Sequence, residues 1–307
     1  MLENIKHKLK LKQLNNWLEK KSKRVVLPGL EGLTLFSLWI IFAEGILKGT
    51  FTTRASSIAF SFFMAIFPFL LFILNLIPFV WFIDDFQLKL QTFIDELLPP
   101  QTSNFFDSIF TDIANNPRGG LLSFVFVLSI ILMANGINAI FTGFEDSYHT
   151  TDNRGIARQY FIAVATAIII AFLLLLTVIT TIYLTYLIER LSDLGIFKNI
   201  IWAQIGRYAV FVFMIYNAIA TLYYFGTREG RDSRYFSIGA LFTTFLILLM
   251  TFFFKIYITN FSRYNELYGS IGALLILMFY IWLNSNILLL GYELNASINK
   301  LKKRRNR

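Results

Sequence analysis

Long apolar stretches without a charged residue, rather than short amphipathic repeats, organise this chain. A helix needs roughly 20 apolar residues to cross about 30 Å of hydrocarbon. Six charge-free stretches reach that length, at residues 55–83, 119–144, 159–188, 208–227, 235–254 and 267–292. Because an ionised side chain is costly at the bilayer centre, we predict an all-α integral membrane protein with six transmembrane helices. The predicted spans lie at about residues 55–80, 119–144, 159–188, 200–226, 235–257 and 267–295.

Shorter patterns flank the first predicted span. The apolar block from Gly32 to Ala43 holds only 12 residues before Glu44, so we expect an interfacial N-terminal helix there rather than a seventh span. After the first span, residues 86–97 and 105–113 place apolar side chains on one face at helical spacing. We therefore expect short amphipathic helices in the first outside loop.

The basic residues indicate which side of the membrane each segment faces. With six spans, 21 Lys and Arg residues fall on one side and six on the other, and cytoplasmic segments carry the excess. Both the N- and C-termini are therefore expected in the cytoplasm. We divide the chain into a basic cytoplasmic N-terminal segment (1–30), a single transmembrane bundle (31–299) and a basic cytoplasmic tail (300–307). The first 24 residues lack the apolar core of a signal peptide, so the N-terminal segment is expected to be retained.

Composition agrees with a membrane location and narrows the expected partners. The chain is 56% hydrophobic and 15% charged, with 34 Phe and a net charge of +9. Because the positive charge gathers at the two ends, we expect the lipid bilayer as the main partner and no nucleic acid. The N-terminal segment is interpreted either as a basic helix on anionic lipid head groups or as a solvated positive tail.

Few residues are suited to catalysis or metal binding. The chain has no Cys and two His, His7 and His149, so zinc sites and conventional catalytic triads are not expected. Glu145, Asp146 and Asp152 lie close together in sequence, but we interpret them as solvated caps between helices. The chain also lacks the common nucleotide-binding and nucleophile-elbow motifs. We expect no enzyme activity and no catalytic residue, cofactor or metal.

Polar residues inside the predicted spans are the remaining functional candidates, because polar groups are unfavourable in hydrocarbon. Asn135 and Asn138 share one face of the second span, and Pro68 is expected to kink the first. Arg207 is interpreted as snorkelling to the outer interface, as part of an ion pair, or as lining a solute path. Interhelical hydrogen bonding explains each amide alone, whereas convergence on one cavity would indicate function. The candidate set is Arg54, Pro68, Asn75, Asn135, Asn138, Arg207, Asn217, Asn284 and Glu293.

Two stretches resemble the YihY/BrkB family of bacterial inner-membrane proteins. The first is RASSIAFSFFMAIFP from Arg54 to Pro68, similar to the family's charged residue followed by a small-residue helix and a proline. The second leads from YGSIGA, which begins at Tyr268, to GYELNA, which begins at Gly291, and is similar to the family's closing helix. The resemblance implies six membrane helices and a location in the bacterial inner membrane. It implies no settled activity, since family members have been labelled both ribonuclease BN and virulence factors.

Three functions remain open on the sequence alone. Pro68, the in-membrane amides and Arg207 favour a transporter-like protein that handles a lipid or another amphipathic solute. A membrane scaffold that assembles partners is the second hypothesis, and it would depend on the basic ends or the outer loop. The third is the tRNA-processing ribonuclease of the old family label, which the residue inventory disfavours. Substrate, transport direction, energy coupling and oligomeric state are left open.

Overall fold

Helices are the regular secondary structure of the described part of the chain. The computed structural model describes residues 51–76, 122–147, 154–193, 201–228, 230, 234–261 and 270–305, together with Leu88 and Thr92. The helices, with no strand among these residues, are α3 (Phe51–Leu76), α6 (Leu122–Glu145), α7 (Ile156–Asp193), α8 (Ile201–Gly226), α9 (Ile238–Phe261) and α11 (Ser270–Arg305). The predicted all-α fold class is confirmed for this part of the chain.

Five of these helices are long and apolar enough to cross a membrane. The candidate spans are Val127–Glu145, Ile156–Leu184, Ile205–Gly226, Ile238–Ile258 and Leu274–Lys300. They coincide with the second to the sixth predicted spans. The first predicted span corresponds to α3, where Phe51–Ile66 forms a shorter apolar helix and the helical backbone continues to Leu76. The multi-pass helical architecture is therefore confirmed, and the count of six spans stays a prediction.

Several predicted features lie at or beyond the edges of the described residues. The expected interfacial helix at 32–43 and the pattern at 105–113 lie outside them, as does the segment 1–30. Within the pattern at 86–97, Leu88 and Thr92 are helical, and the Thr92 hydroxyl donates to the Leu88 carbonyl at 3.0 Å. Pro68 and Asn75 belong to the second half of α3, whose side chains are not described, so the kink at Pro68 stays a prediction.

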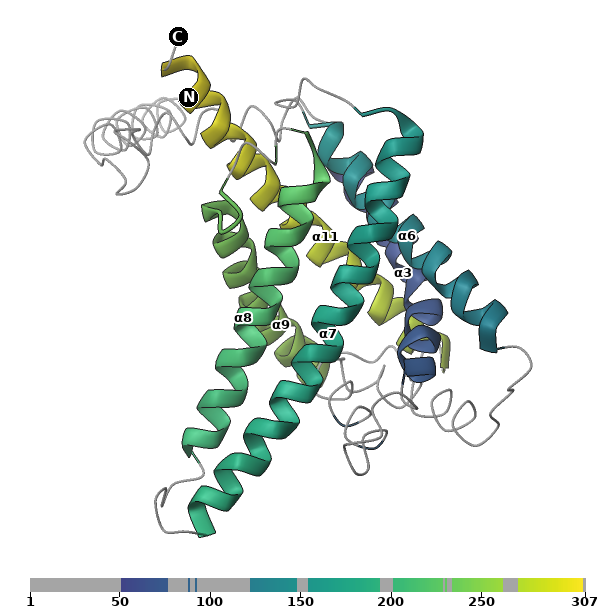
Figure 1. The fold of residues 1–307 in the computed structure, drawn as a ribbon. Helices are drawn as coiled ribbons and strands as arrows, with labels where there is room; N and C mark the ends of the chain where they lie inside the picture. The colour runs from purple at the N-terminus through teal and green to yellow at the C-terminus, as the bar shows by residue number, and fades with distance from the viewer. Residues whose placement is uncertain are drawn as a thin grey trace, which may run out of the picture.

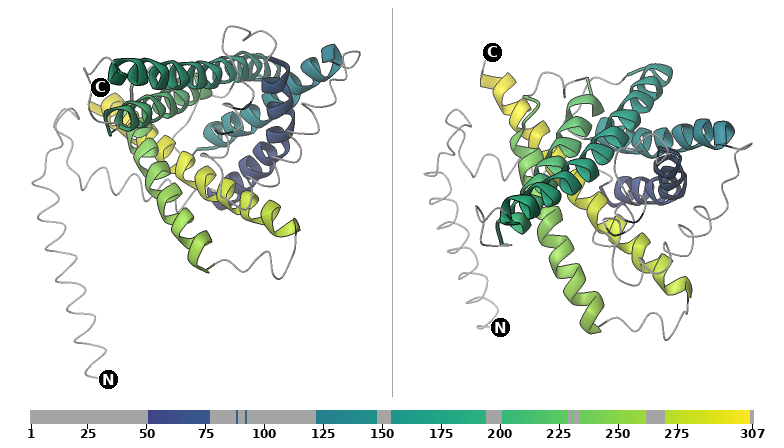
Figure 2. Two further views of the ribbon diagram at one scale, coloured as in Figure 1. Left: turned by 90° about the horizontal axis from the view of Figure 1, so that it is seen from below. Right: turned by 60° about the horizontal axis from the view of Figure 1, so that its bottom comes forward.

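The helices cross near one end of the bundle. We call this the inner end, because the charge distribution predicts that it faces the cytoplasm; α6, α8 and α11 finish there and α3, α7 and α9 begin there. α11 packs against α3 on one side and α9 on the other, while α6 packs between α3 and α7 (Figure 1). From the crossing, α7 and α8 run side by side, whereas α9 and α11 diverge from them (Figure 2).

The largest cluster of buried side chains lies mainly toward the inner end, while a smaller one, with Phe254, Ile258 and Ile276, joins α9 to α11 nearer their outer ends. The main cluster of buried side chains includes Phe141 and Phe144 of α6, Tyr223 of α8, and Leu289 and Tyr292 of α11. Large apolar side chains nearer the outer ends of α7, α8 and α9 are exposed, as expected for surfaces that face lipid. They include Tyr183, Tyr186, Leu187, Ile205, Tyr208, Phe252, Phe253 and Ile256. The bundle is therefore closely packed at its inner end.

Small residues allow the helices to approach each other closely. Ala163, Ala167 and Ala171 of α7 are at most 1% exposed, so this stripe of small residues packs against other helices. α9 meets α11 at Gly239 and Gly291, where a Cβ added to Gly239 would overlap the Gly291 carbonyl oxygen. A larger residue at either glycine would force the inner ends of α9 and α11 apart.

Candidate functional site: a buried charge centre

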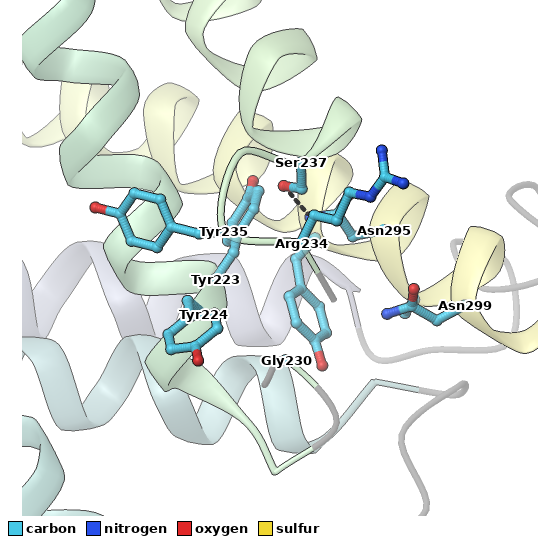
Figure 3. A pocket seen from close by; sticks show the side chains of 10 residues that line it. Tyr223, Tyr224, Gly230, Arg234, Tyr235, Ser237, Asn295 and Asn299 are labelled. Carbon is cyan, nitrogen blue, oxygen red and sulfur yellow. Dashed lines mark hydrogen bonds between the residues drawn. The ribbon is translucent and has the colours of Figure 1, made fainter. Parts of the chain in front are cut away.

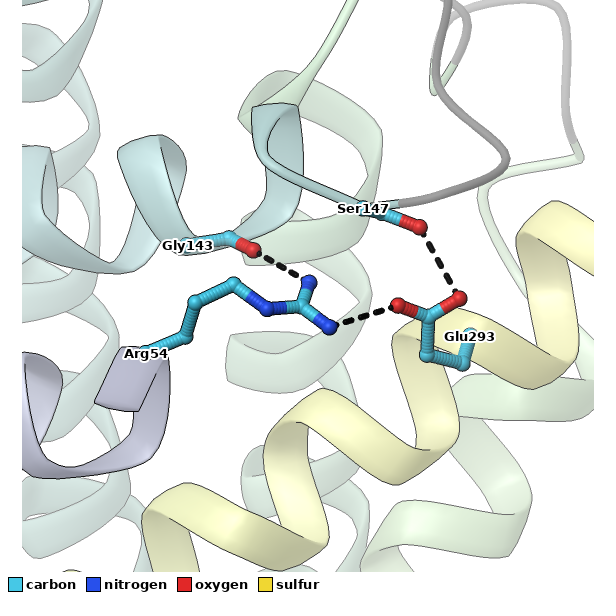
Figure 4. A network of polar contacts seen from close by, with 4 residues as sticks. All are labelled: Arg54, Gly143, Ser147 and Glu293. Carbon is cyan, nitrogen blue, oxygen red and sulfur yellow. Dashed lines mark hydrogen bonds and ion pairs between the residues drawn. The ribbon is translucent and has the colours of Figure 1, made fainter. Parts of the chain in front are cut away.

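A buried ion pair joins α3 to α11 near the inner end of the bundle (Figure 4). Nη2 of Arg54 donates a hydrogen bond to Oε1 of Glu293 at 3.0 Å, and the two side chains are 3% and 0% exposed. Arg54 lies in the first turn of α3, whereas Glu293 lies in the second half of α11. The pair therefore closes the first of the described membrane helices onto the last.

The end of α6 supplies the other partners of this pair. Nη1 of Arg54 donates to the carbonyl oxygen of Gly143 at 2.9 Å, and the hydroxyl of Ser147 donates to Oε2 of Glu293 at 2.9 Å. The last carbonyls of a helix have no intrahelical partner, so Gly143 can accept from another helix. Both carboxylate oxygens of Glu293 and both Nη atoms of Arg54 thus have a hydrogen-bond partner. The Arg54 guanidinium also lies 5.8 Å from the centroid of the Phe51 ring, within reach of a cation–π contact. We call Arg54, Gly143, Ser147 and Glu293 the charge centre.

An aromatic cluster fixes α11 beside α6 and α8. The ring of Phe144 stacks on that of Tyr292, with centroids 4.3 Å apart, and meets Tyr223 edge-on at 5.4 Å. The Tyr223 hydroxyl donates to the Leu288 carbonyl at 2.7 Å, so its 2.6 Å contact with the Thr243 hydroxyl is one in which Thr243 donates. Because Phe144 follows Gly143 and Tyr292 precedes Glu293, these contacts also position the charge centre.

On the opposite side of α11, Asn295 caps the start of α9. The first backbone N–H groups of a helix lack intrahelical partners. Here the Gly239 N–H donates to Oδ1 of Asn295 at 2.8 Å, and Nδ2 of Asn295 donates to the Ser237 hydroxyl at 2.7 Å. The hydroxyl of Ser237 also accepts from the Ala240 N–H at 3.2 Å, which is the usual role of a residue that precedes a helix.

Glu145 is buried, so its interpretation as a solvated cap was wrong. Its exposure is 7%, and Gln159 of α7, with its amide nitrogen directed toward the carboxylate, donates to Oε2 at 2.9 Å. The backbone N–H of Arg154 lies 3.4 Å from Oε1. The physical reason is that the chain returns from α6 into α7 here, so residues from both helices cover the carboxylate. Asp146 is exposed, as expected, and Asp152 lies outside the described residues.

The other polar candidates whose side chains the structure describes do not join the charge centre. Asn217 and Asn284 each donate from Nδ2 to the backbone carbonyl four residues earlier in their own helix, at 2.8 Å. Asn135 is exposed on α6, while Asn138 and Arg207 are half-buried. Asn217 and Asn284 thus bond within their own helices, which differs both from the interhelical hydrogen bonding expected for single amides and from convergence on one cavity.

Sequence reasoning selected Arg54 and Glu293 separately and missed their pairing. It also missed the roles of Ser147 and of the Gly143 carbonyl, neither of which stands out in the sequence. One signal was available: two charges of opposite sign lie at the inner edges of the first and last predicted spans. Opposite charges at equal depth are candidates for an interhelical ion pair, because pairing lowers the free energy of both.

The described part of the chain offers no ready metal centre. No group of three or more His, Cys, Asp or Glu side chains is placed to hold a metal ion among the residues that the structure describes. Glu145 and Glu293 are instead hydrogen-bonded to the protein groups named above. The charge centre holds α3, α6 and α11 together through a buried ion pair and its hydrogen bonds.

Several long apolar helices that cross around a buried ion pair define a multi-pass α-helical membrane protein. The family model Virulence factor BrkB matches residues 42–307, so the chain belongs to this family. That match confirms the resemblance indicated by the two sequence stretches around Arg54 and Glu293.

Named relatives agree with the family assignment. The chain is 27% identical over 259 residues to the Putative ribonuclease-like protein YfkH of Bacillus subtilis (strain 168), and the match covers 82% of this chain and 91% of YfkH. It is 24% identical over 245 residues to a UPF0761 membrane protein of Coxiella burnetii (strain Dugway 5J108-111), covering 78% of this chain and 84% of that protein. A UPF0761 membrane protein of Psychrobacter sp. (strain PRwf-1) is 23% identical, and 45% of its length is covered. No solved structure matches the chain.

Proposed function

We propose that the chain is a transporter-like protein of the bacterial inner membrane that moves a phospholipid or a similarly amphipathic solute. The observation that carries this proposal is the buried Arg54–Glu293 pair, which links the first described helix to the last at the inner end. In this proposal the charge centre keeps the inner end closed, and its separation opens a path between the helices.

The energetics of the pair support a role beyond holding helices together. Taking two charges out of water is unfavourable, and a well-packed apolar pair often gives equal or greater stability. Charged residues within membrane helices are correspondingly rare and commonly mark solute or ion pathways. Ala55, next to Arg54 in sequence, and Leu289, one turn before Glu293, belong to the main buried apolar cluster.

The distribution of packing supports the same proposal. Phe141, Phe144 and Leu289 are fully buried at the inner end, around the charge centre. When groups of helices rotate against each other about the point where they cross, the contacts at the inner end separate. Many transporters use such rigid-body movements to expose a binding site to one side of the membrane and then to the other. Exposed aromatic and aliphatic side chains suit an amphipathic solute, because its apolar part stays in contact with them.

The test is movement of labelled lipid across a vesicle membrane. The full chain is reconstituted into phosphatidylcholine/phosphatidylglycerol vesicles that contain phosphatidylglycerol or lysophosphatidylglycerol with a fluorescent nitrobenzoxadiazole label. Dithionite, added outside, bleaches the outer-leaflet label. We expect bleaching beyond the outer-leaflet fraction of protein-free vesicles, with or without an imposed proton or sodium gradient, and a changed rate in Glu293→Gln. Bleaching equal to that of protein-free vesicles for both lipids and all gradients would overturn the proposal.

The two other functions give different outcomes. A scaffold would leave lipid movement at the protein-free level and would retain partners when purified from the membrane. A ribonuclease, as the name of YfkH indicates for that protein, would require RNA cleavage by the purified chain with magnesium and its loss in Glu145→Ala. Because Glu145 already accepts hydrogen bonds from Gln159 and from the Arg154 backbone, we expect no cleavage.

A further inference from the structure

A small pocket lined by aromatic and polar side chains lies at the inner end, between α8 and α11 (Figure 3). Its walls come from the end of α8, the connection that leads into α9, and α11. Tyr224 and Tyr235 contribute aromatic rings, and Ser237, Asn295 and Asn299 contribute polar groups. The enclosed part measures about 10 Å³, which is room for one oxygen-sized group. Any larger ligand must therefore place one atom inside and the rest at the mouth.

Arg234 is the charged side chain among the described residues that line the pocket. Arg234 lies on the rim and is exposed, with its guanidinium extending away from the pocket floor (Figure 3). A guanidinium presents a planar set of donors that matches the oxygens of a phosphate group. Asn295, whose amide caps α9, and Asn299 also line the pocket near it. The chemistry at the mouth is therefore suited to a phosphate.

An apolar surface begins directly beside this polar mouth. Phe236 is 54% exposed, and the outward face of α9 continues with Ile238, Leu241 and Phe245, which are 43%, 60% and 61% exposed. The last three recur at helical spacing and so lie on one side of α9, pointing along the helix toward the membrane interior. The ring of Tyr235 meets that of Phe236 at 5.0 Å, so the pocket wall adjoins an exposed aromatic side chain that comes just before α9.

From this juxtaposition we propose that the pocket binds the phosphate of an anionic phospholipid from the cytoplasmic leaflet, whose acyl chains lie along the outward face of α9. Arg234 contacts the phosphate, and one phosphate oxygen enters the pocket beside Asn295. Basic pockets between membrane helices on the cytoplasmic side are known to suit such head groups, and the apolar flank explains why a lipid rather than a free anion is the ligand. This inference does not rest on the transport proposal, since a bound lipid is compatible with a scaffold as well.

The test compares lipid binding with and without the rim charge. The full chain, purified in detergent, is titrated with dioctanoyl-phosphatidylglycerol, dioctanoyl-phosphatidylcholine or inorganic phosphate while its thermal unfolding is followed. We expect the anionic lipid to raise the melting temperature well above the effect of the other two. A basic residue near a membrane surface contributes enough to anionic-lipid binding that Arg234→Gln should weaken the apparent affinity about fivefold.

A matched control separates the pocket from general surface charge. Arg158 is also an exposed arginine near the inner end, on α7, and it does not line the pocket. Arg158→Gln should leave the affinity for the anionic lipid unchanged, and Arg234→Lys should retain part of it. Equal effects of the anionic and zwitterionic lipids, or equal weakening by both glutamine variants, would overturn the proposal. An equal effect of inorganic phosphate would show a free-phosphate site and would overturn the lipid assignment.

Discussion

Removing one partner of the Arg54–Glu293 pair gives the sharpest prediction. Both side chains are almost completely buried, and the pair has hydrogen bonds to Gly143 and Ser147. Glu293→Met leaves the Arg54 guanidinium without a counter-ion in a buried site. Arg54→Met leaves a carboxylate, which can become neutral by binding a proton, whereas a guanidinium cannot lose one. We therefore expect Glu293→Met to be the more destabilising variant.

The size of the effect follows from the burial of the pair. Breaking a buried ion pair by removing one partner typically destabilises a protein by about 3–5 kcal/mol. With the usual relation between free energy and melting temperature for larger domains, Glu293→Met should lower the melting temperature by roughly 6–20 °C. The double variant, with Met at both positions, leaves no buried charge and should recover much of the loss. Its deviation from the sum of the single effects measures the coupling between the two residues.

The assay is thermal unfolding in detergent, followed by size-exclusion chromatography of the soluble fraction. Arg158→Met serves as the control, because Arg158 is an exposed arginine near the same end of the bundle and its loss should change little. A Glu293→Met variant as stable as the natural chain would refute the reasoning. So would a double variant whose loss equals the sum of the two single losses, since the two charges would then be independent.

Three further predictions concern the surroundings of the charge centre. Gly291→Val should impair folding, measured as the monodisperse yield after purification, because its side chain would overlap the Thr243 hydroxyl; a normal yield would contradict the close α9–α11 contact. Tyr223→Phe removes hydrogen bonds to Thr243 and to a backbone carbonyl and should destabilise the protein by about 1–3 kcal/mol in the unfolding assay; no change would mean that these bonds are not formed. Asn217→Ala should change stability by less than about 1 kcal/mol, because its amide donates to a carbonyl of its own helix, and a larger loss would indicate a missed interhelical partner.

The sequence predicted the features that depend on local composition. Five predicted spans coincide with helices because the exclusion of charge from hydrocarbon is a strong constraint that acts on each segment separately. The buried alanine stripe of α7 was predictable for the same reason, since small residues at regular spacing mark a contact face. By contrast, α11 runs on to Arg305, past the predicted end of the last span, because nothing in its basic end breaks a helix.

The features that depend on distant segments were not predictable in the same way. Arg54 and Glu293 are 239 positions apart, and only the folded bundle shows that they meet. Glu145 looked like a solvated charge because its neighbours in sequence are polar, yet Gln159 of the next helix covers it. In both cases the order of charged and apolar residues along the chain indicates how deep a residue lies in the membrane. Which residue of another helix lies beside it at that depth depends on how the helices cross.

The unbroken length of α11 restricts how the inner end of the bundle can move. It is a single helix of 36 residues, about 54 Å long, so its segments are displaced together. Glu293 and Asn295 project from it about 200° apart, one toward α3 and the other toward the start of α9. A rotation of α11 that draws Glu293 away from Arg54 therefore also shifts the amide that holds the first turn of α9. The two contacts belong to one rigid body, and neither can be released without disturbing the other.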